Sequence, residues 1–193
     1  EGLAMTPELS RTLNAIGMLA VCLVLALAFF YQLVLYELPC PLCLLQRVGF
    51  VAVGVGLGLN LLYGPRPQHY AIVLIAALYG GTVSIRQILL HIVPGTGHYG
   101  SPVLGLHYYT WAGIAFFLVL LGTSIMLLFD RQYADPSGQE PRFGGNTLAK
   151  IAFFVMLALA VLNAGSTLLE CGPGICADPP TSYKLIDELD AGN

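Results

Sequence analysis

The sequence contains few charged residues. Charged side chains make up 10% of the 193 residues and hydrophobic ones 56%, whereas a typical soluble domain carries about 25% charged residues. The mean hydropathy is +0.76. A soluble core of this length could not bury so much apolar surface. The shortage of charge therefore excludes a soluble domain and predicts an integral membrane protein.

Basic residues are scarce as well. Eight Lys and Arg residues stand against eleven Asp and Glu residues, which gives a net charge of −3, and the basic residues form no stripe along the chain. Nucleic acids and anionic lipid surfaces are bound through clustered positive charge. We therefore expect no nucleic-acid partner and no polybasic lipid-binding patch.

Long apolar stretches dominate what is present. A helix of about 20 residues crosses the hydrocarbon core of a bilayer, which is about 30 Å thick. Five stretches approach or exceed this length, at residues 12–36, 41–63, 70–93, 107–129 and 151–169. The predicted fold is therefore all-α, a polytopic membrane helical bundle with a polar loop at 130–150 and a polar tail after the fifth span.

The basic residues predict how this bundle is oriented. If five spans alternate, one side receives Arg11, Arg66, Arg131, Arg142 and Lys150, together with the N-terminus. Loops rich in Lys and Arg face the cytoplasm, so we expect a cytoplasmic N-terminus. The loop after the first span and the tail after the fifth then lie outside, in the compartment where disulfides persist.

Four of the five cysteines fall in these two outer segments. Cys40 and Cys43 follow the first span, and Cys171 and Cys176 follow the fifth. Cys22 lies in the middle of the first span, and we interpret it as an inert buried side chain, because its neighbours are apolar. The outer pairs are the candidates for redox chemistry.

The first pair has the spacing of a redox motif. Pro41 suits the first turn of a helix, which places Cys43 where free N–H groups and the helix dipole stabilise a thiolate, the reactive form of cysteine. Arg47 lies one turn further on the same face and adds a permanent cation. The spacing alone also fits a structural disulfide or half of a metal site.

Two more ionisable residues come from the corresponding end of the third span. Arg86 and His91 lie within or beside apolar sequence, and ionisable residues inside a membrane span are functional candidates. They join Arg47 as candidate residues of a cofactor site. Arg86 could instead extend to the lipid headgroups, and His91 could cap an interfacial turn.

These residues resemble the DsbB-type disulfide bond formation proteins, which are quinone-dependent membrane oxidoreductases. The most specific match is PCPLCLLQRV at 39–48, followed by GPR at 64–66, residues 86–91, LGL at 104–106 and Trp111. The resemblance covers roughly residues 36–129. It implies a DsbB-like four-helix core over residues 1–129, to which residues 130–193 add an inner loop, a fifth transmembrane helix and an outer cysteine-bearing tail.

The resemblance also implies roles for individual residues. Cys43 is expected to contact a quinone, and Cys40 is expected to exchange with a second cysteine pair. Arg47, Arg86 and His91 are expected to form the quinone site. The quinone would be ubiquinone or menaquinone from the membrane pool, and the protein partner a periplasmic thioredoxin-fold oxidant of the DsbA type.

The sequence departs from that family at the second cysteine pair. The family carries this pair in the outer loop between the third and fourth spans, but residues 94–107 contain no cysteine. The tail instead carries ECGPGIC at 170–176, whose Gly-Pro-Gly interior allows a tight turn between the two sulfurs. We interpret Cys171 and Cys176 as the relocated shuttle. One alternative is a disulfide that only braces the tail, and another is a shifted function in which the protein oxidises a different client.

The function that we predict is a thiol:quinone oxidoreductase in the bacterial inner membrane, with both cysteine pairs facing the periplasm. Electrons would pass from the partner dithiol to Cys171/Cys176, then to Cys40/Cys43, and then to quinone. One alternative is a non-catalytic membrane subunit that scaffolds a larger complex. Another is a quinone reductase of the vitamin K epoxide reductase type.

Histidines in the outer loop raise the question of a metal site. His98 and His107 lie there, close to His91 in the sequence. Their spacing fits no metal motif, so we predict no metal site.

Overall fold

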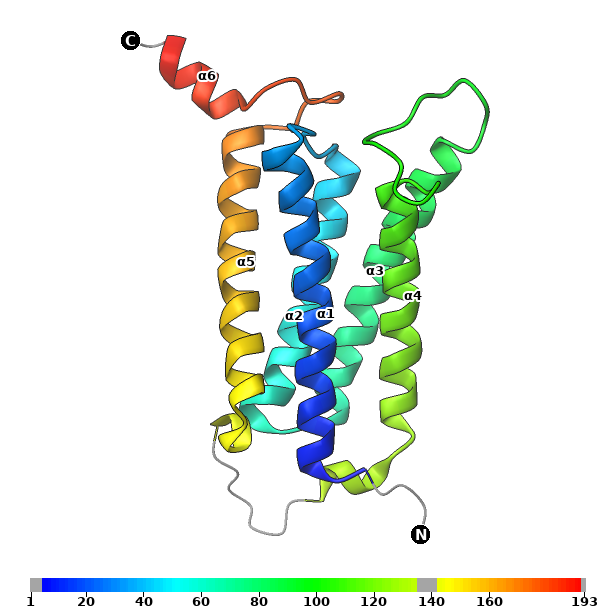
Figure 1. Ribbon diagram of the computed structural model, residues 1–193, viewed down its shortest axis with the longest axis vertical. Helices are drawn as coiled ribbons and strands as arrows, with labels where there is room; N and C mark the ends of the chain where they lie inside the picture. Colours follow the sequence, from blue (N-terminus) through cyan, green and yellow to red (C-terminus); the bar gives the residue numbers. More distant parts are fainter. Residues whose placement is uncertain (1–4, 135–141, 192–193) are drawn as a thin grey trace.

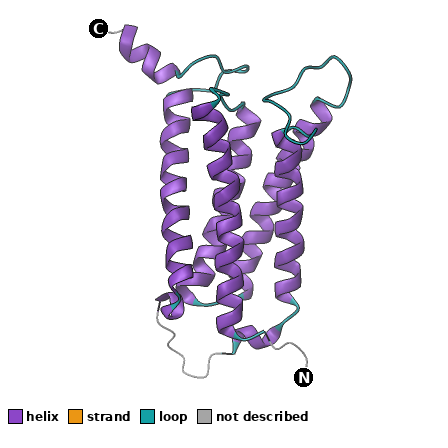
Figure 2. Ribbon diagram, in the orientation of Figure 1, coloured by secondary structure: helices purple, strands orange, loops and turns teal. Residues whose placement is uncertain are grey.

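The computed structural model describes residues 5–134 and 142–191. These residues form helices and loops, without a strand (Figure 2). The α-helices are α1 (Pro7–Val34), α2 (Pro41–Tyr63), α3 (Pro67–Leu90), α4 (Tyr108–Leu127), α5 (Thr147–Cys171) and α6 (Lys184–Ala191), and two short 3₁₀ helices are η1 (Asp130–Tyr133) and η2 (Arg142–Gly145). Helices α1 to α5 are long and apolar enough to cross a membrane. The predicted all-α membrane bundle is confirmed.

Helix boundaries follow local capping signals. The side chain of Thr6 accepts a hydrogen bond from the N–H of Leu9 and starts α1, and proline occupies the first position of α1, α2 and α3. Because Pro67 favours a first helical turn, α3 begins three residues earlier than predicted, and it also ends three residues earlier. Part of the predicted polar loop, residues 135–141, lies outside the described residues.

Helix α5 differs from the prediction in a way that concerns the tail. Asn146 caps its start by accepting a hydrogen bond from the N–H of Ala149, so the helix begins at Thr147 rather than at residue 151. It ends at Cys171 rather than at residue 169. The expectation that Cys171 lies beyond the helix end is therefore wrong, because the last helical turn continues through this residue.

Helices α2 and α3 pack against each other, with α1 and α5 beside α2 and with α4 beside α3. Helix α1 packs on α2 and α5, whereas α4 packs on α3 and has little contact with α1. Figure 1 shows α5 beside α1 on one side of the bundle and α4 beside α3 on the other. The fifth helix thus covers the side of α1 opposite α4, which leaves the space between α1 and α4 uncovered.

Gly80 leaves a notch in the surface of α3, and Phe116 of α4 packs into it. The ring of Phe116 lies so close to Gly80 that a Cβ there would be 2.1 Å from the ring, and it stacks on Phe50 with centroids 4.0 Å apart. Glycines of α2 serve the same purpose: a Cβ on Gly54 would lie 2.6 Å from the sulfur of Met156 in α5. The glycines of α2 thus allow neighbouring helices to approach it closely.

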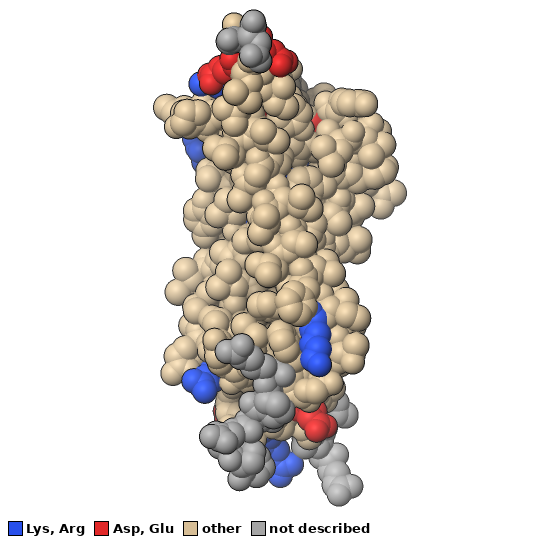
Figure 3. Space-filling view, turned by 90° about the vertical axis from the view of Figure 1, so that its left-hand side faces the viewer, with Lys and Arg blue, Asp and Glu red and all other residues tan. Residues whose placement is uncertain are grey.

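The two ends of the bundle differ from its middle. Figure 3 shows a broad uncharged belt, with Lys, Arg, Asp and Glu gathered toward the ends of the molecule. The start of α2 and the end of α5 meet at the same end, and the tail passes over it toward α6 (Figure 1). One end of the bundle therefore carries all four disulfide-bonded cysteines, Cys40, Cys43, Cys171 and Cys176. We call it the outer end, after the predicted orientation, and the opposite end the inner end.

Candidate functional site

The Cys40–Cys43 pair forms the start of α2. Cys40 is the N-cap residue, its sulfur accepts a hydrogen bond from the N–H of Cys43 at 3.2 Å, and the two sulfurs form a disulfide. Pro41 follows as the first helical residue. Cys40 is 2% exposed and Cys43 is half-buried. Of the two sulfur-bearing residues, Cys43 is therefore the more accessible.

A glutamine that the sequence analysis missed contacts both sulfurs. The side-chain Nε2 of Gln87 lies 3.1 Å from Sγ of Cys40 and 3.5 Å from Sγ of Cys43, and Gln46 donates to Oε1 of Gln87 at 2.9 Å. Gln87 is fully buried in α3. An amide in an otherwise apolar span was the signal available in the sequence, because a buried amide needs hydrogen-bond partners.

A cavity of about 450 Å³ adjoins this pair. Its walls come mainly from α1, α2 and α4, and Glu37, Cys43, Gln46 and Arg47 contribute polar atoms to a lining that is otherwise mostly apolar or aromatic. Leu27 of α1 and Leu118 of α4 line the cavity and are also exposed on the side of the bundle. The cavity therefore opens sideways between α1 and α4, where the two helices have little contact.

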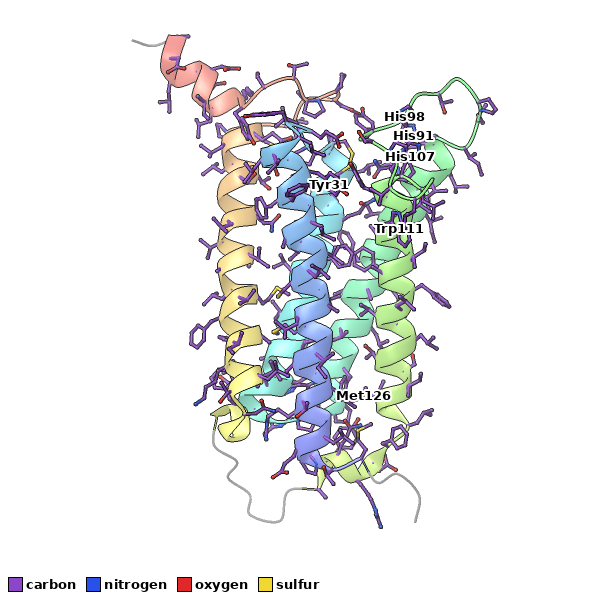
Figure 4. All side chains as sticks on the ribbon, in the orientation of Figure 1. Tyr31, His91, His98, His107, Trp111 and Met126 are labelled. Carbon is purple, nitrogen blue, oxygen red and sulfur yellow. A yellow bond between two sulfur atoms is a disulfide. The ribbon has the colours of Figure 1, made fainter. Side chains whose placement is uncertain are left out.

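Aromatic side chains surround the outer part of the cavity. The rings of Tyr31 of α1 and Tyr108 of α4 lie with their centroids 4.4 Å apart and their planes tilted by 35°, and both line the cavity, as does Trp111. Figure 4 shows Tyr31 and Trp111 on facing helices near the outer end. An apolar, aromatic cavity with a few polar groups at one side is the usual form of a site for a flat organic ligand.

Arg47 is the cation of the cavity wall. Its guanidinium donates to Oε1 of Gln32 at 2.6 Å and to the carbonyl of Ala28 at 3.1 Å, and it lies 5.4 Å from the ring centre of Phe29. The residue is 8% exposed. Arg47 thus shares a face with Cys43, as the sequence analysis expected, and its hydrogen-bond acceptors are neutral.

Arg86 and His91 take different positions from Arg47. Arg86 is exposed on α3 and is not among the residues that line the cavity. His91 does not line the cavity either, but its ring lies 5.6 Å from the rings of Tyr99 and Tyr109, which do. The structure therefore brings Arg47 to the cavity, places His91 behind its wall, and leaves Arg86 apart.

The second cysteine pair closes the end of α5. Cys171 is the last residue of the helix and is 4% exposed, whereas Cys176 is half-buried in the following turn. The two form a disulfide. Cys176 is therefore the more exposed residue of this pair.

Hydrogen bonds connect the tail to the rest of the outer end. The Nε2 group of Gln32 donates to Oγ of Ser166 at 2.7 Å and to the hydroxyl of Tyr183 at 3.0 Å. Tyr99, from the loop between α3 and α4, donates its hydroxyl to the carboxylate of Asp178. This hydrogen bond is the main cause that raises the pKa of Tyr99. The tail therefore reaches both Arg47, through Gln32, and a residue of the cavity wall.

The outer histidines lie close together without forming a larger ligand group. The rings of His98 and His107 are 4.7 Å apart, and Figure 4 shows them with His91 at one corner of the outer end. Within residues 5–134 and 142–191, no three His, Cys, Asp or Glu side chains are placed to hold a metal ion. Cys22 is buried in α1 with a free thiol.

Comparison with known proteins gives the family of the chain. The family model "Disulfide bond formation protein DsbB" matches residues 10–99. Among curated proteins named "Disulfide bond formation protein B", that of Aromatoleum aromaticum is 33% identical over 84 residues, covering 41% of this chain and 51% of its own. That of Chromobacterium violaceum is 42% identical over 71 residues, covering 35% and 43%. The chain thus spans about half the length of these two relatives.

A third relative is matched over most of both chains. The "Disulfide bond formation protein B" of Xanthomonas axonopodis pv. citri is 33% identical over 159 residues, which cover 78% of this chain and 87% of that protein. No solved structure matches the chain. With a family match that contains the Cys40–Cys43 pair and Arg47, and a relative aligned over most of its length, the chain belongs to the DsbB family of disulfide bond formation proteins.

Proposed function

We propose that the protein is a membrane thiol:quinone oxidoreductase that makes disulfides. In this proposal it resides in the bacterial inner membrane with its N-terminus in the cytoplasm, and its two cysteine pairs face the periplasm. The observation that carries the proposal is the cavity at Cys43. This cavity is apolar, opens sideways between two membrane spans, and has Cys43 and Arg47 in its wall.

The residues of the cavity fit a quinone from the membrane pool, ubiquinone or menaquinone. Apolar walls and the rings of Tyr31 and Trp111 suit a flat ring and an isoprenoid chain, and the opening faces the region of the lipid tails. The cavity wall carries hydrogen-bond donors for quinone oxygens, among them Gln46 and Arg47 on the same helix as Cys43. A bound quinone would accept two electrons and two protons.

The cysteines carry the electrons by thiol–disulfide exchange, in which a thiolate attacks a disulfide sulfur. A thiolate of a thioredoxin-fold partner, of the DsbA type, attacks Sγ of Cys176, because Cys171 is buried. This breaks the Cys171–Cys176 bond. The second partner thiolate then closes the partner disulfide, and Cys171 and Cys176 are left reduced with two electrons.

The tail pair then reduces the Cys40–Cys43 pair. Cys40 is 2% exposed, so in this proposal the start of α2 opens for the exchange. The thiolate of Cys176 then attacks Sγ of Cys40, which breaks the Cys40–Cys43 bond and releases Cys43 as a thiolate at the start of α2. The thiolate of Cys171 attacks Cys176 and restores the tail disulfide. Cys40 and Cys43 now hold the two electrons. Arg47 and the helix N-terminus stabilise the thiolate of Cys43 beside the cavity.

A substitution that fills the cavity tests the proposal. Ala115 of α4 lines the cavity and is half-buried, so Ala115→Phe should block quinone entry and strongly reduce quinone-dependent oxidation of a small dithiol. Ala158→Phe, on the exposed face of α5, is the matched control and should leave the rate unchanged. Equal rates in the two variants, or no quinone reduction by the wild-type protein, would contradict the proposal and favour the scaffold alternative.

A further inference from the structure

A buried polar cluster joins the tail to Arg47. Hydrogen bonds link Gln32, Arg47, Ser166 and Tyr183, and Glu170 interacts electrostatically with Arg47. We call these five residues the outer polar cluster. Gln32 is its centre, because its amide donates to Ser166 and Tyr183 and accepts from Arg47. The cluster therefore connects α1, α2, α5 and the tail directly behind the cavity wall.

Glu170 is the one member of this cluster whose side chain makes no hydrogen bond in the described part of the chain. The residue is 5% exposed, and both carboxyl oxygens are buried and without a partner. It lies in the last turn of α5, next to Cys171. The negative end of the helix dipole is located there and disfavours an anion. Burial without donors disfavours a carboxylate further.

Arg47 is near Glu170 but is not in contact with it. Each group acts electrostatically on the other, yet within the described residues neither carboxyl oxygen of Glu170 has a hydrogen-bond partner. Arg47 instead donates to the neutral oxygens of Gln32 and Ala28. We would expect an ionised carboxylate that is buried near a guanidinium to pair with it. The observed arrangement therefore fits a carboxyl group that carries a proton.

Arg47 is the one cation of the outer polar cluster. Gln32 from α1 and Ser166 from α5 are uncharged, and Tyr183 is the third ionisable group of the cluster, beside Arg47 and Glu170. Lys184, at the start of α6, is half-exposed and lies 3.8 Å from Glu188. Arg47 is therefore the cation through which a change of charge on Glu170 acts.

We propose that Glu170 is a positioning residue for Arg47. Glu170 carries a proton in the resting protein, so it does not pair with the guanidinium of Arg47, whose positive charge then acts on the cavity. When Glu170 loses this proton to solvent, its carboxylate competes for Arg47 and weakens the support that Arg47 gives to the thiolate of Cys43. The fifth helix and the tail would in this way control the electrostatics of the cavity. The role of Arg47 at Cys43 rests on the proposed function, whereas the proton on Glu170 does not.

Infrared spectroscopy tests the proton directly. A protonated carboxyl without hydrogen bonds gives a carbonyl-stretch band at a frequency distinct from that of carboxylates. We expect this band in the wild-type protein at neutral pH and its loss in Glu170→Gln, whereas Glu188→Gln, at an exposed residue of α6, should retain it. A wild-type spectrum without the band overturns the proposal. If Glu170→Gln does not fold, loss of the band during a pH titration of the wild-type protein gives the same answer.

The pH dependence of quinone reduction tests the coupling to Arg47. A small dithiol is supplied to the full-length protein, and the rate of Glu170→Gln is divided by that of the wild type at each pH, which cancels the ionisation of the dithiol. We expect a ratio near one at acid pH that rises to about tenfold as the wild-type carboxyl ionises. Glu170→Asp, which keeps a titratable group, should stay closer to the wild type.

The outcomes separate this proposal from the proposed function. A ratio that stays constant with pH, or that falls with rising pH, overturns the coupling to Arg47 even if the protein reduces quinone. A wild-type protein that shows the carboxyl band but reduces no quinone overturns the proposed function and leaves the proton on Glu170 in place.

Discussion

The two ends of the bundle contain buried polar clusters of different character. At the inner end, Ser10, Asn14, Asn60, Tyr70 and Gln132 form a cluster of neutral side chains. His69 contacts Asn60 at 3.0 Å, and Arg11, next to Ser10 in the sequence, is 2% exposed. Each member of this neutral cluster is hydrogen-bonded, as in the contacts of Asn14 with Tyr70 at 2.8 Å and of Tyr70 with Gln132 at 2.9 Å. The outer polar cluster contains a cation and a carboxyl group without a hydrogen bond, beside a cavity and two disulfides.

We infer from this difference that the buried polar residues of the two ends have different roles, stabilising the fold at the inner end and serving the reaction at the outer end. A neutral, satisfied network stabilises helix packing, since each buried polar group finds a partner. Buried charge and unpartnered groups are costly in an apolar protein and mark functional sites inside membranes. We therefore expect substitutions at the inner cluster to lower stability, and substitutions at the outer end to lower activity.

The largest effect is expected at Cys43. Cys43→Ser removes the sulfur that borders the cavity, so quinone reduction should be lost even with a strong small dithiol, while the protein remains folded. The measurement is quinone absorbance after mixing with dithiol, with Cys22→Ser as a control that keeps full activity because this buried thiol is remote from the proposed electron path. Full turnover of Cys43→Ser would remove Cys43 from the mechanism.

The next largest effect is expected on quinone affinity when Arg47 is substituted, and the same substitution at Arg86 is the matched control. Arg47→Gln removes the cation of the cavity wall and should weaken quinone affinity by about tenfold or more, since hydrogen bonds from charged groups contribute about 1.5–3 kcal/mol. Arg47→Lys keeps the charge but loses the planar fork and should be milder. Arg86→Gln should have little effect, because Arg86 is exposed. Quenching of Trp111 fluorescence by a short-chain quinone reports the affinity, and equal losses at the two arginines would contradict this account.

Tyr70→Phe tests the inner cluster. The substitution removes a buried hydroxyl that Asn14 and Gln132 contact, and the free energy of unfolding should fall by about 1–3 kcal/mol because buried partners lose a hydrogen bond. The rate of quinone reduction per folded molecule should not change. Denaturation in detergent measures the first quantity and a dithiol assay the second. A lower rate without a loss of stability would assign the inner cluster to function.

The smallest effect is expected at Tyr99. Its hydroxyl donates to Asp178, and this bond raises the pKa of Tyr99. The contact should therefore persist through neutral pH and be lost as the pH rises through the raised pKa, because the ionised phenol no longer donates and repels the carboxylate. Tyr99→Phe should increase hydrogen exchange of residues 172–183 slightly at neutral pH. Unchanged exchange would show that Tyr99 does not hold the tail.

Much of the fold follows from one-dimensional signals. Apolar length predicts the five spans, and prolines with the Gly64-Pro65 turn predict the limits of α2. The positions of Cys40, Cys43 and Arg47 on one helical face follow from spacing alone. Because these signals are local, the sequence carries them without knowledge of neighbouring helices.

Other features depend on contacts that local signals do not contain. In a membrane span nearly every face is apolar, so hydropathy does not tell which face packs. The docking of Phe116 into the notch at Gly80, and with it the opening between α1 and α4, could not be predicted. The contact of Gln87 with both sulfurs and the continuation of α5 through Cys171 were missed for the same reason.

The central claim is that electrons enter at the tail and leave at the cavity, and one double variant tests it most directly. In Cys171→Ser with Cys176→Ser, a small dithiol should still reduce quinone through Cys40 and Cys43, because the cavity and α2 are unaltered. Oxidation of a thioredoxin-fold dithiol partner by the same preparation should be lost. Unchanged oxidation of the protein partner, or loss of both activities in a folded protein, would contradict the account.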